Sequence, residues 1–289
     1  MTTTLNPPRR AFGNIAGVDF DFLLKSEIPG IIDRWRRAGR RGYVTLTNPH
    51  SVMLCRRDQE MRHATSQATI TLPDGVGIVL GARLLGHGRR HRCTGPAMML
   101  EICDKGRELD LSHYFYGGAE GVPDRLAERL SETFPGLKVA GTCCPPFGQM
   151  TAEEDDAIVA RINAAKPDII WVGLGAPKQE KWMAAHLGRI KATALIGVGA
   201  AFDFHSGNVE WAPDFMRRFG LEWAYRLARN PRRMWRRNLD SPIFLACVAQ
   251  QVAGAMWWRL RGSARRGYKV PGFKPDRAAS LLSRETDQL

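Results

Sequence analysis

The six cysteines of this 289-residue chain form no Cys-x-x-Cys pair. They are widely spaced, except that Cys143 and Cys144 are adjacent. A zinc ribbon needs cysteines paired at short spacing, and a small disulfide-stapled domain needs a denser cysteine framework. The sequence therefore argues against both classes and favours a reducing cytoplasm.

The first ten residues lack the apolar segment that forms the centre of a secretory signal peptide. We therefore expect no cleaved leader. Internal repeats and low-complexity tracts are also absent from the sequence. With 44% hydrophobic residues over 289 positions, the chain can build one large α/β domain together with an appendage.

Two nucleotide-binding fingerprints are missing. There is no G-x-G-x-x-G motif and no Walker A sequence, which weakens the hypotheses of a nicotinamide-dependent oxidoreductase and of a P-loop enzyme. No Asp-x-Asp pair stands out as a holder of a metal–diphosphate complex. These absences fit a reaction that uses neither a cofactor nor a metal ion.

Acidic residues are scarce relative to basic ones. The chain has 42 lysines and arginines against 29 aspartates and glutamates, which gives a net charge of +13. So basic a chain favours a polyanionic partner, namely nucleic acid, an anionic membrane surface or a phosphorylated substrate.

Short apolar runs alternate with helix-like segments over most of the chain. The expected strands are 43–47, 112–116, 137–141, 168–172 and 194–198, and the expected helices are 122–133, 152–165 and 178–187. This alternation is typical of βαβ units, so we predict an α/β fold with a Rossmann-like parallel sheet. Ligands of such sheets bind at the carboxyl ends of the strands.

The composition changes near residue 208. Between Arg217 and Arg237 there are eight arginines and one acid, Glu222. We predict a Rossmann-like core over 1–208 and a basic, mainly helical appendage over 209–289. Within it, Ile243–Trp258 is apolar but short for a membrane span. A helix lying on the membrane is favoured by Trp257, Trp258 and the arginines after them; a buried or dimer-forming helix and a true span are the alternatives.

Three glycine-rich turns are candidate nucleotide sites. They contain Gly75 and Gly77, then Gly173 and Gly175, and finally Gly199. Glycines after strands allow a close approach to a diphosphate, whose charge the next helix N-terminus stabilises, although ordinary turn glycines would give the same pattern.

Polar residues at two of the expected turns could act on a substrate. Asp74 could serve as a general base for a sugar hydroxyl, or it could cap the helix that begins near Val76. Thr47 and Asn48 end an expected strand before Pro49, where ordinary turn chemistry is the competing explanation.

Five blocks together resemble the WecG/TagA/CpsF family of bacterial glycosyltransferases over about residues 43–240. They are Thr45-Leu-Thr-Asn-Pro49, Asp74-Gly-Val-Gly77, Gly173-Leu-Gly-Ala-Pro-Lys-Gln-Glu180, Gly197-Val-Gly-Ala-Ala-Phe-Asp203 and Gly220-Leu-Glu-Trp-Ala-Tyr-Arg226, the last followed by Pro231-Arg-Arg233 and Trp235-Arg-Arg237.

The resemblance implies an inverting, metal-independent transfer of a sugar, such as N-acetylmannosamine or a uronic acid relative, from a UDP-sugar to a polyprenyl-diphosphate-linked acceptor. It implies Asp74 as the general base, with Thr47 and Asn48 at the active site. Gln179 and the turn glycines would bind the donor. The arginines Arg226, Arg233, Arg236 and Arg237 would bind the acceptor diphosphate, because guanidinium groups pair with phosphate oxygens in a forked geometry.

Two positions bear on the donor sugar. After Thr94-Gly95 the family usually has an aspartate two residues past the glycine, whereas this chain has Pro96 and Ala97. The run Pro145-Pro-Phe-Gly148 resembles a subgroup associated with exopolysaccharide synthesis. Both differences leave the identity of the donor open.

The resemblance places the protein on the cytoplasmic face of the bacterial inner membrane, in cell-surface or exopolysaccharide synthesis, with homo-oligomers possible. The alternative is a basic membrane- or nucleic-acid-binding protein without transferase activity. The absence of a known nucleic-acid motif, and the mixing of the basic residues with tryptophan and leucine at helical spacing, count against nucleic acid.

Overall fold

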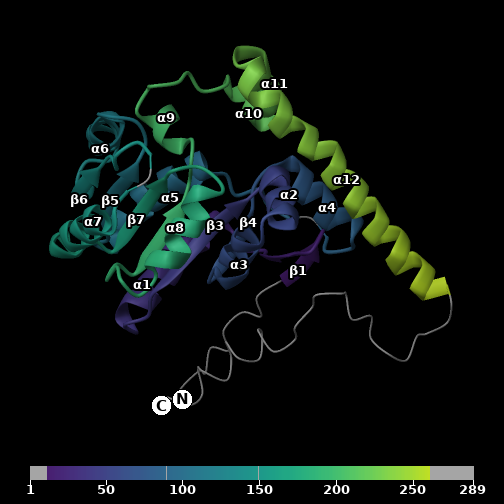
Figure 1. The fold of residues 1–289 in the computed structure, drawn as a ribbon, viewed down its shortest axis with the longest axis horizontal. Helices are drawn as coiled ribbons and strands as arrows, with labels where there is room; N and C mark the ends of the chain where they lie inside the picture. Colours follow the sequence, from purple (N-terminus) through teal and green to yellow (C-terminus); the bar gives the residue numbers. More distant parts are fainter. Residues whose placement is uncertain (1–11, 89, 149, 261–289) are drawn as a thin grey trace.

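A parallel β-sheet forms the centre of the molecule (Figure 1). The computed structural model describes residues 12–88, 90–148 and 150–260. Within these ranges the sheet has six strands in the order β4-β3-β8-β7-β5-β6, and every neighbouring pair is parallel. The strands are β3 (Gly42–Thr47), β4 (Ile70–Pro73), β5 (Ser112–Gly117), β6 (Lys138–Cys143), β7 (Ile169–Gly173) and β8 (Ala194–Gly197).

The predicted α/β class and parallel sheet are thus confirmed. The one strand of this sheet that the sequence pattern did not reveal is β4, which has four residues and ends at Pro73. It pairs with β3 through Val44–Ile70 and Thr47–Pro73, at the edge of the sheet. Its run Ile-Thr-Leu-Pro contains a polar residue and ends in proline, and proline in a run argues against a strand.

Alternate residues along the strands face two helical layers. One face packs against α1 (Ile28–Arg37), α5 (Gly95–Glu108), α6 (Val122–Thr133) and α9 (Ala201–His205). The other face packs against α3 (Gln59–Gln67), α7 (Ala152–Ala165) and α8 (Lys178–His186). Buried aromatic side chains such as Trp171 and Tyr116 fill these two layers, as the two-residue period of a strand requires.

A third apolar cluster lies beside the β4 edge of the sheet. It joins the antiparallel hairpin β1 (Phe12–Ile15) and β2 (Val18–Asp21) to α2 (Pro49–Arg57), α4 (Val76–Leu84) and α12 (Pro231–Leu260). Phe244 and Val248 of α12 are fully buried here. Gln251 also accepts a hydrogen bond from the backbone N–H of Ala16 at 2.9 Å. The C-terminal helix is therefore packed against the core.

The segment after the sheet crosses above its carboxyl edge before α12 descends along the side of the molecule (Figure 1). It includes α10 (Asp214–Arg218) and α11 (Glu222–Arg229), which precede the 30-residue α12. The appendage is helical, as expected, but its boundary at residue 208 stays a prediction. The sequence has a second basic cluster after the apolar stretch; its first member, Arg259, lies in α12, whereas Arg261, Arg265, Arg266 and Lys269 lie outside the described residues.

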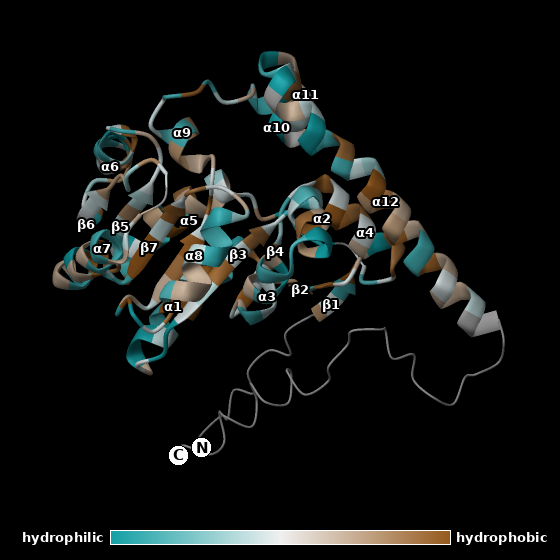
Figure 2. Cartoon of the chain, viewed as in Figure 1, coloured by the Kyte–Doolittle hydropathy of each residue, from teal (hydrophilic) through white to brown (hydrophobic). Residues whose placement is uncertain are grey.

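Apolar residues run along much of α12, interrupted by hydrophilic ones (Figure 2). Its stretch Met234–Trp257 is long and apolar enough to cross a membrane, judged by length and composition, and 17% of the apolar window is buried. The exposed apolar side chains include Leu239, Ile243, Leu245, Met256 and Trp257. The expected apolar helix therefore exists and begins twelve residues earlier than Ile243.

Candidate active site

A cleft opens at the carboxyl edge of the sheet, between the strand ends and the C-terminal segment. It encloses about 650 Å³ of space, part of which is open to solvent. Its lining comes from the ends of β3, β4, β7 and β8 and from the beginnings of α5 and α9, with α11 and α12 on the far side. This is the place where open parallel sheets bind ligands.

Asp74 lines this cleft, immediately after β4. Its backbone N–H donates to the carbonyl oxygen of Thr47 at 3.0 Å, which fixes the end of β4 against the end of β3. Gly75, not Asp74, is the N-cap of α4, and that cap involves no side-chain hydrogen bond. The helix-cap alternative is therefore wrong, and the Asp74 carboxylate is left to face the cleft.

The surroundings of Asp74 favour its neutral form. Burial raises its pKa from 3.8 to about 6, and the negative charge of Glu222 acts in the same direction. The positive charges of Arg92, Arg237 and Arg226 oppose this rise. A carboxylate whose pKa lies this close to neutrality is well suited to accept a proton and to release it again.

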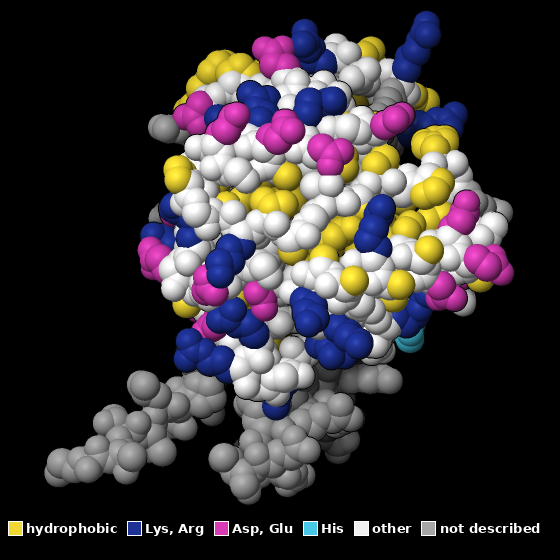
Figure 3. Space-filling view, turned by 90° about the vertical axis from the view of Figure 1, so that its left-hand side faces the viewer, with side chains coloured by type: hydrophobic (Ala, Val, Ile, Leu, Met, Phe, Trp, Pro, Cys, Tyr) yellow, Lys and Arg dark blue, Asp and Glu magenta, His cyan; other side chains and the backbone are white. Residues whose placement is uncertain are grey.

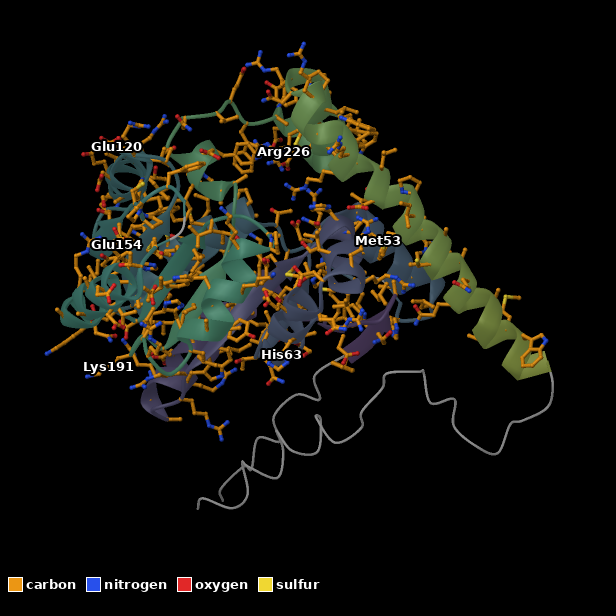
Figure 4. All side chains as sticks on the ribbon, viewed as in Figure 1. Met53, His63, Glu120, Glu154, Lys191 and Arg226 are labelled. Atoms are coloured by element: carbon orange, nitrogen blue, oxygen red, sulfur yellow. The ribbon has the colours of Figure 1, made fainter. Side chains whose placement is uncertain are left out.

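Two arginines face the cleft from the C-terminal segment. Arg226, labelled in Figure 4, lies on α11 with its guanidinium 3.7 Å from the Glu222 carboxylate and 5.1 Å from the centre of the Phe204 ring. Arg237 lies on the first turns of α12, and its charge lowers the pKa of both Asp74 and the buried Glu180. The structure therefore brings the Asp74 carboxylate into the same cleft as cationic groups that can bind phosphate.

Arg233 and Arg236 differ from these two arginines. The side chain of Arg233 lies outside the described part of the chain. Arg236 is exposed, does not line the cleft, and has its guanidinium 5.5 Å from the centre of the Trp235 ring. A role for both in binding the acceptor diphosphate stays a prediction.

Asn48 and Thr47 lie at the end of β3 in different settings. Asn48 lines the cleft and caps α2, since its Oδ1 accepts from the Ser51 N–H at 3.0 Å. Thr47 is 1% exposed, and its hydroxyl has no hydrogen-bond partner among the described residues. The capping of α2 thus explains why an asparagine stands at position 48. A direct role for Asn48 or Thr47 in the reaction stays a prediction.

Gln179 reaches the floor of the cleft from the first turn of α8. Its Nε2 donates to Oε1 of Glu180 at 2.8 Å. The remaining Oε1 of Gln179 is buried, and no described group donates to it. A buried acceptor without a donor is costly, so this oxygen is suited to a ligand hydroxyl or N–H.

The predicted donor-binding glycines fall into two groups. Gly175 and Gly199 line the cleft, and both have positive φ angles, +73° and +52°. Gly75, Gly77 and Gly173 are absent from its lining. At Gly77 and Gly173 the local packing explains the residue, because a Cβ would lie 2.8 Å from Pro49 and 2.6 Å from the Phe202 ring. Their contact with the donor stays a prediction.

Among the described residues, no group of three or more histidine, cysteine or acidic side chains is arranged to hold a metal ion. One Asp-x-Asp pair does occur, at Asp19 and Asp21 in β2. Asp19 accepts from Asn14 at 2.7 Å and Asp21 accepts from the Thr71 N–H at 2.9 Å. Both carboxylates therefore support the hairpin rather than the cleft.

Sequence reasoning assigned no role to two charged residues that influence Asp74. Glu222 lines the cleft. It belongs to the family-like Gly220–Arg226 block, and this membership could have identified Glu222 from the sequence. Arg92 lies just before Thr94-Gly95 and donates to the carbonyl oxygen of Arg217 at 2.9 Å. Pro96, at the departure from the family pattern, also lines the cleft.

Comparison with known proteins gives a consistent result. Residues 13–256 match the family described as the Glycosyl transferase WecG/TagA/CpsF family. The chain is 32% identical over 232 residues to an N-acetylglucosaminyldiphosphoundecaprenol N-acetyl-beta-D-mannosaminyltransferase from Bacillus spizizenii, covering 80% of this chain and 88% of the relative. Proteins of the same name from Bacillus subtilis and Staphylococcus aureus (strain MW2) are 29% and 27% identical, covering 72% and 82% of this chain and 79% and 92% of their own lengths.

Proposed function

The chain belongs to the WecG/TagA/CpsF family of glycosyltransferases, and from this premise we propose that it transfers an N-acetylhexosamine from a UDP-sugar to a sugar carried on a polyprenyl diphosphate. The predicted glycosyltransferase activity in the synthesis of lipid-linked surface polysaccharides is confirmed by this membership. A basic binding protein without activity, the alternative from sequence, has no comparable support.

The observation that carries this proposal is the position of Asp74 in the same cleft as Arg226 and Arg237. In a single-displacement transfer, Asp74 takes the proton from the acceptor hydroxyl as that oxygen attacks the anomeric carbon. The bond to the departing UDP breaks at the same carbon, so the configuration inverts. Arginines are suited to the diphosphate charge because they remain protonated throughout.

Gln179, Gly175 and Gly199 are the proposed donor side of the cleft. The first turn of α8 lines the cleft there through Gln179, and the partial positive charge of this helix N-terminus favours a diphosphate. The charge that leaves with UDP can thus be stabilised by this helix dipole and by arginines, so the proposed reaction needs no metal ion.

The relatives named above transfer N-acetylmannosamine to an undecaprenyl-diphosphate-linked N-acetylglucosamine, which makes this pair the first candidate here. Pro96 in the cleft lining is the reason to include uronic acid relatives and other N-acetylhexosamines among the donors. Since a lipid-linked acceptor is held in a membrane, the enzyme works at a membrane surface, and we propose the cytoplasmic face of the inner membrane.

The test is a donor screen with purified protein. A panel of UDP-sugars is incubated with a short-chain polyprenyl-diphosphate N-acetylglucosamine, and released UDP and the disaccharide product are both measured. We expect product from UDP-N-acetylmannosamine or a close relative, with inversion at the anomeric carbon. UDP release that does not depend on the acceptor, or no product from any donor in the panel, would contradict the proposal.

A further inference from the structure

Helix α4 of the catalytic core carries an apolar stripe that faces solvent. Val76, Leu80 and Leu84 are 49%, 43% and 53% exposed, and their spacing of four residues places them on one side of the helix. The opposite side of α4 is buried, with Ile78 and Ala82 both 0% exposed. Three large apolar side chains in a row on a solvent-facing side are unusual for a surface helix and mark an interaction surface.

The stripe continues onto α10. A Cβ added at Gly220 would lie 2.2 Å from a methyl group of Val76, so the turn after α10 touches the start of α4. Phe219, next to this glycine, is 77% exposed, and Phe215 is 61% exposed. The apolar surface therefore extends from Leu84 across Val76 to the two phenylalanines.

The stripe also lies beside α12. A Cβ added at Gly81 of α4 would lie 3.3 Å from the Val248 side chain and 3.5 Å from the Phe244 ring. Helix α4 therefore packs directly against α12, which also carries exposed apolar side chains such as Ile243 and Leu245. Since α12 is the helix that is long and apolar enough for a membrane, the α4 stripe continues a surface of the same character.

Along the chain the segment around α4 is basic, while the exposed Asp214 beside Phe215 is paired with Arg217. Between Asp74 and Glu101 the sequence contains four arginines and no acidic residue. One of them, Arg83, is exposed between Leu80 and Leu84. By contrast, the face at the β6 end of the molecule carries acidic and basic side chains together (Figure 3). Apolar side chains flanked by arginines suit the boundary of an anionic bilayer, where the leucines enter the acyl region and arginines bind phosphate headgroups.

We propose that the solvent-facing side of α4, with Phe215 and Phe219, is a second membrane-contacting surface, which belongs to the catalytic core and acts together with α12. This inference rests on the proposed lipid-linked acceptor. Because α4 begins two residues after Asp74, contact of α4 with the bilayer holds the base near the plane in which a lipid diphosphate lies. The membrane thereby helps to position the acceptor hydroxyl against the base.

The test compares two double variants of the full chain. Leu80→Gln with Leu84→Gln removes two of the three exposed apolar side chains of α4. Val139→Gln with Leu187→Gln is the matched control, because both residues are 37% exposed and lie away from α4, on β6 and at the end of α8. Sedimentation with phosphatidylcholine vesicles containing phosphatidylglycerol measures partition, and transfer is assayed with a short-chain soluble acceptor and with a long-chain acceptor in the same vesicles.

We expect the α4 variant to partition about tenfold more weakly than wild type, with the control unchanged, because the buried apolar area of two leucines is lost. Its activity on the soluble acceptor should remain and its activity on the vesicle-borne acceptor should fall. Unchanged partition would overturn the inference. So would a wild-type dimer, seen by light scattering, that the variant dissociates without any change in partition, since the stripe would then cover a second copy. Failure of wild type on both acceptors would refute the proposed function, while the partition comparison would still decide the role of α4.

Discussion

His50 and Asp240 join the first turn of α2 to α12, with Nδ1 of the histidine 2.5 Å from Oδ2 of the aspartate. Asp240 is 3% exposed, and its other oxygen lies 2.6 Å from the Arg57 guanidinium. Burial lowers the pKa of His50 below its usual 6.5, so the neutral imidazole is favoured at neutral pH. Asn48, two residues before His50, and Arg237, one turn before Asp240, both line the cleft. This pair therefore fixes the position of α12, and with it Arg237, relative to α2 and Asn48.

Asp240→Asn should lower both stability and activity, the latter through Arg237. Loss of the buried charge leaves Arg57 without its partner and should cost about 1–3 kcal/mol of unfolding free energy, measured by urea denaturation. If Asp240 acts by positioning Arg237, Asp240→Asn should lower kcat/KM much less in the Arg237→Ala variant than in wild type. Fully additive effects of the two substitutions would show that Asp240 has a structural role alone.

Asp74→Asn should abolish most of the transfer while leaving the fold intact. A general base contributes about 10²- to 10⁴-fold to a rate, so kcat should fall by that order. Since the native state holds the Asp74 pKa near 6, above the ordinary 3.8, charging this group destabilises the protein as pH rises through that value. The melting temperature of the variant at pH 8 should therefore be no lower than that of wild type. Asp104→Asn, on the outer side of α5, is the control, and near-normal turnover by Asp74→Asn would exclude the proposed base.

Glu222→Gln should shift the pH dependence of the reaction. The wild-type kcat/KM should fall about tenfold per pH unit below pH 6, because the base must be deprotonated and its pKa is raised to about 6. Removing the negative charge of Glu222 lowers that pKa, so the acid limb should move to lower pH without reaching 3.8, since burial remains. Glu210→Gln, a surface carboxylate paired with Arg229, should leave the profile in place. An unmoved acid limb in Glu222→Gln would mean that Asp74 does not set it.

Gln179→Ala should weaken use of the donor. Its buried Oε1 has no described donor, and a ligand hydrogen bond to it would contribute about 0.5–1.5 kcal/mol, or roughly two- to tenfold in kcat/KM for the UDP-sugar. The KM for the acceptor should change less than that for the donor. Kinetics with each substrate varied in turn would measure both, and an effect confined to the acceptor would place Gln179 on the other side of the cleft.

Arg237→Ala and Arg236→Ala form a matched pair of neighbouring residues. Arg237 lines the cleft, whereas Arg236 is exposed. A charge-assisted contact with a diphosphate is worth about 1.5–3 kcal/mol, so Arg237→Ala should lower kcat/KM by roughly 10- to 150-fold. Arg236→Ala should have a much smaller effect on a soluble acceptor. Equal losses in the two variants would point to general electrostatic attraction by the appendage.

Much of the fold could be predicted from local patterns. Apolar runs such as 168–172 and 194–198 alternate with helical segments, and βαβ chirality and strand polarity then place the residues that follow them at one edge of the sheet. Asn48, Gln179, Gly175 and Gly199 follow expected strands and do line one cleft, together with Asp74, which was identified from its glycine turn and the family resemblance. Strand β4 was missed although β8 is equally short, because the β4 run Ile-Thr-Leu-Pro is interrupted by a polar residue and ends in proline, which argues against a strand.

The tertiary structure decided which of these residues share an environment. The sequence could not distinguish base from helix cap at Asp74, because that depends on the backbone of Gly75, whose φ is +90°. Nor could it distinguish Arg237 from Arg236. The sequence does not show which side of α12 faces the cleft, because this depends on how the helix packs against the rest of the molecule. The sequence determined the family and the parallel sheet, because both follow from local residue order. The long-range packing of α12 on α2 and α4 set the charges around Asp74, since electrostatic interactions depend on distances in space that residue order leaves open.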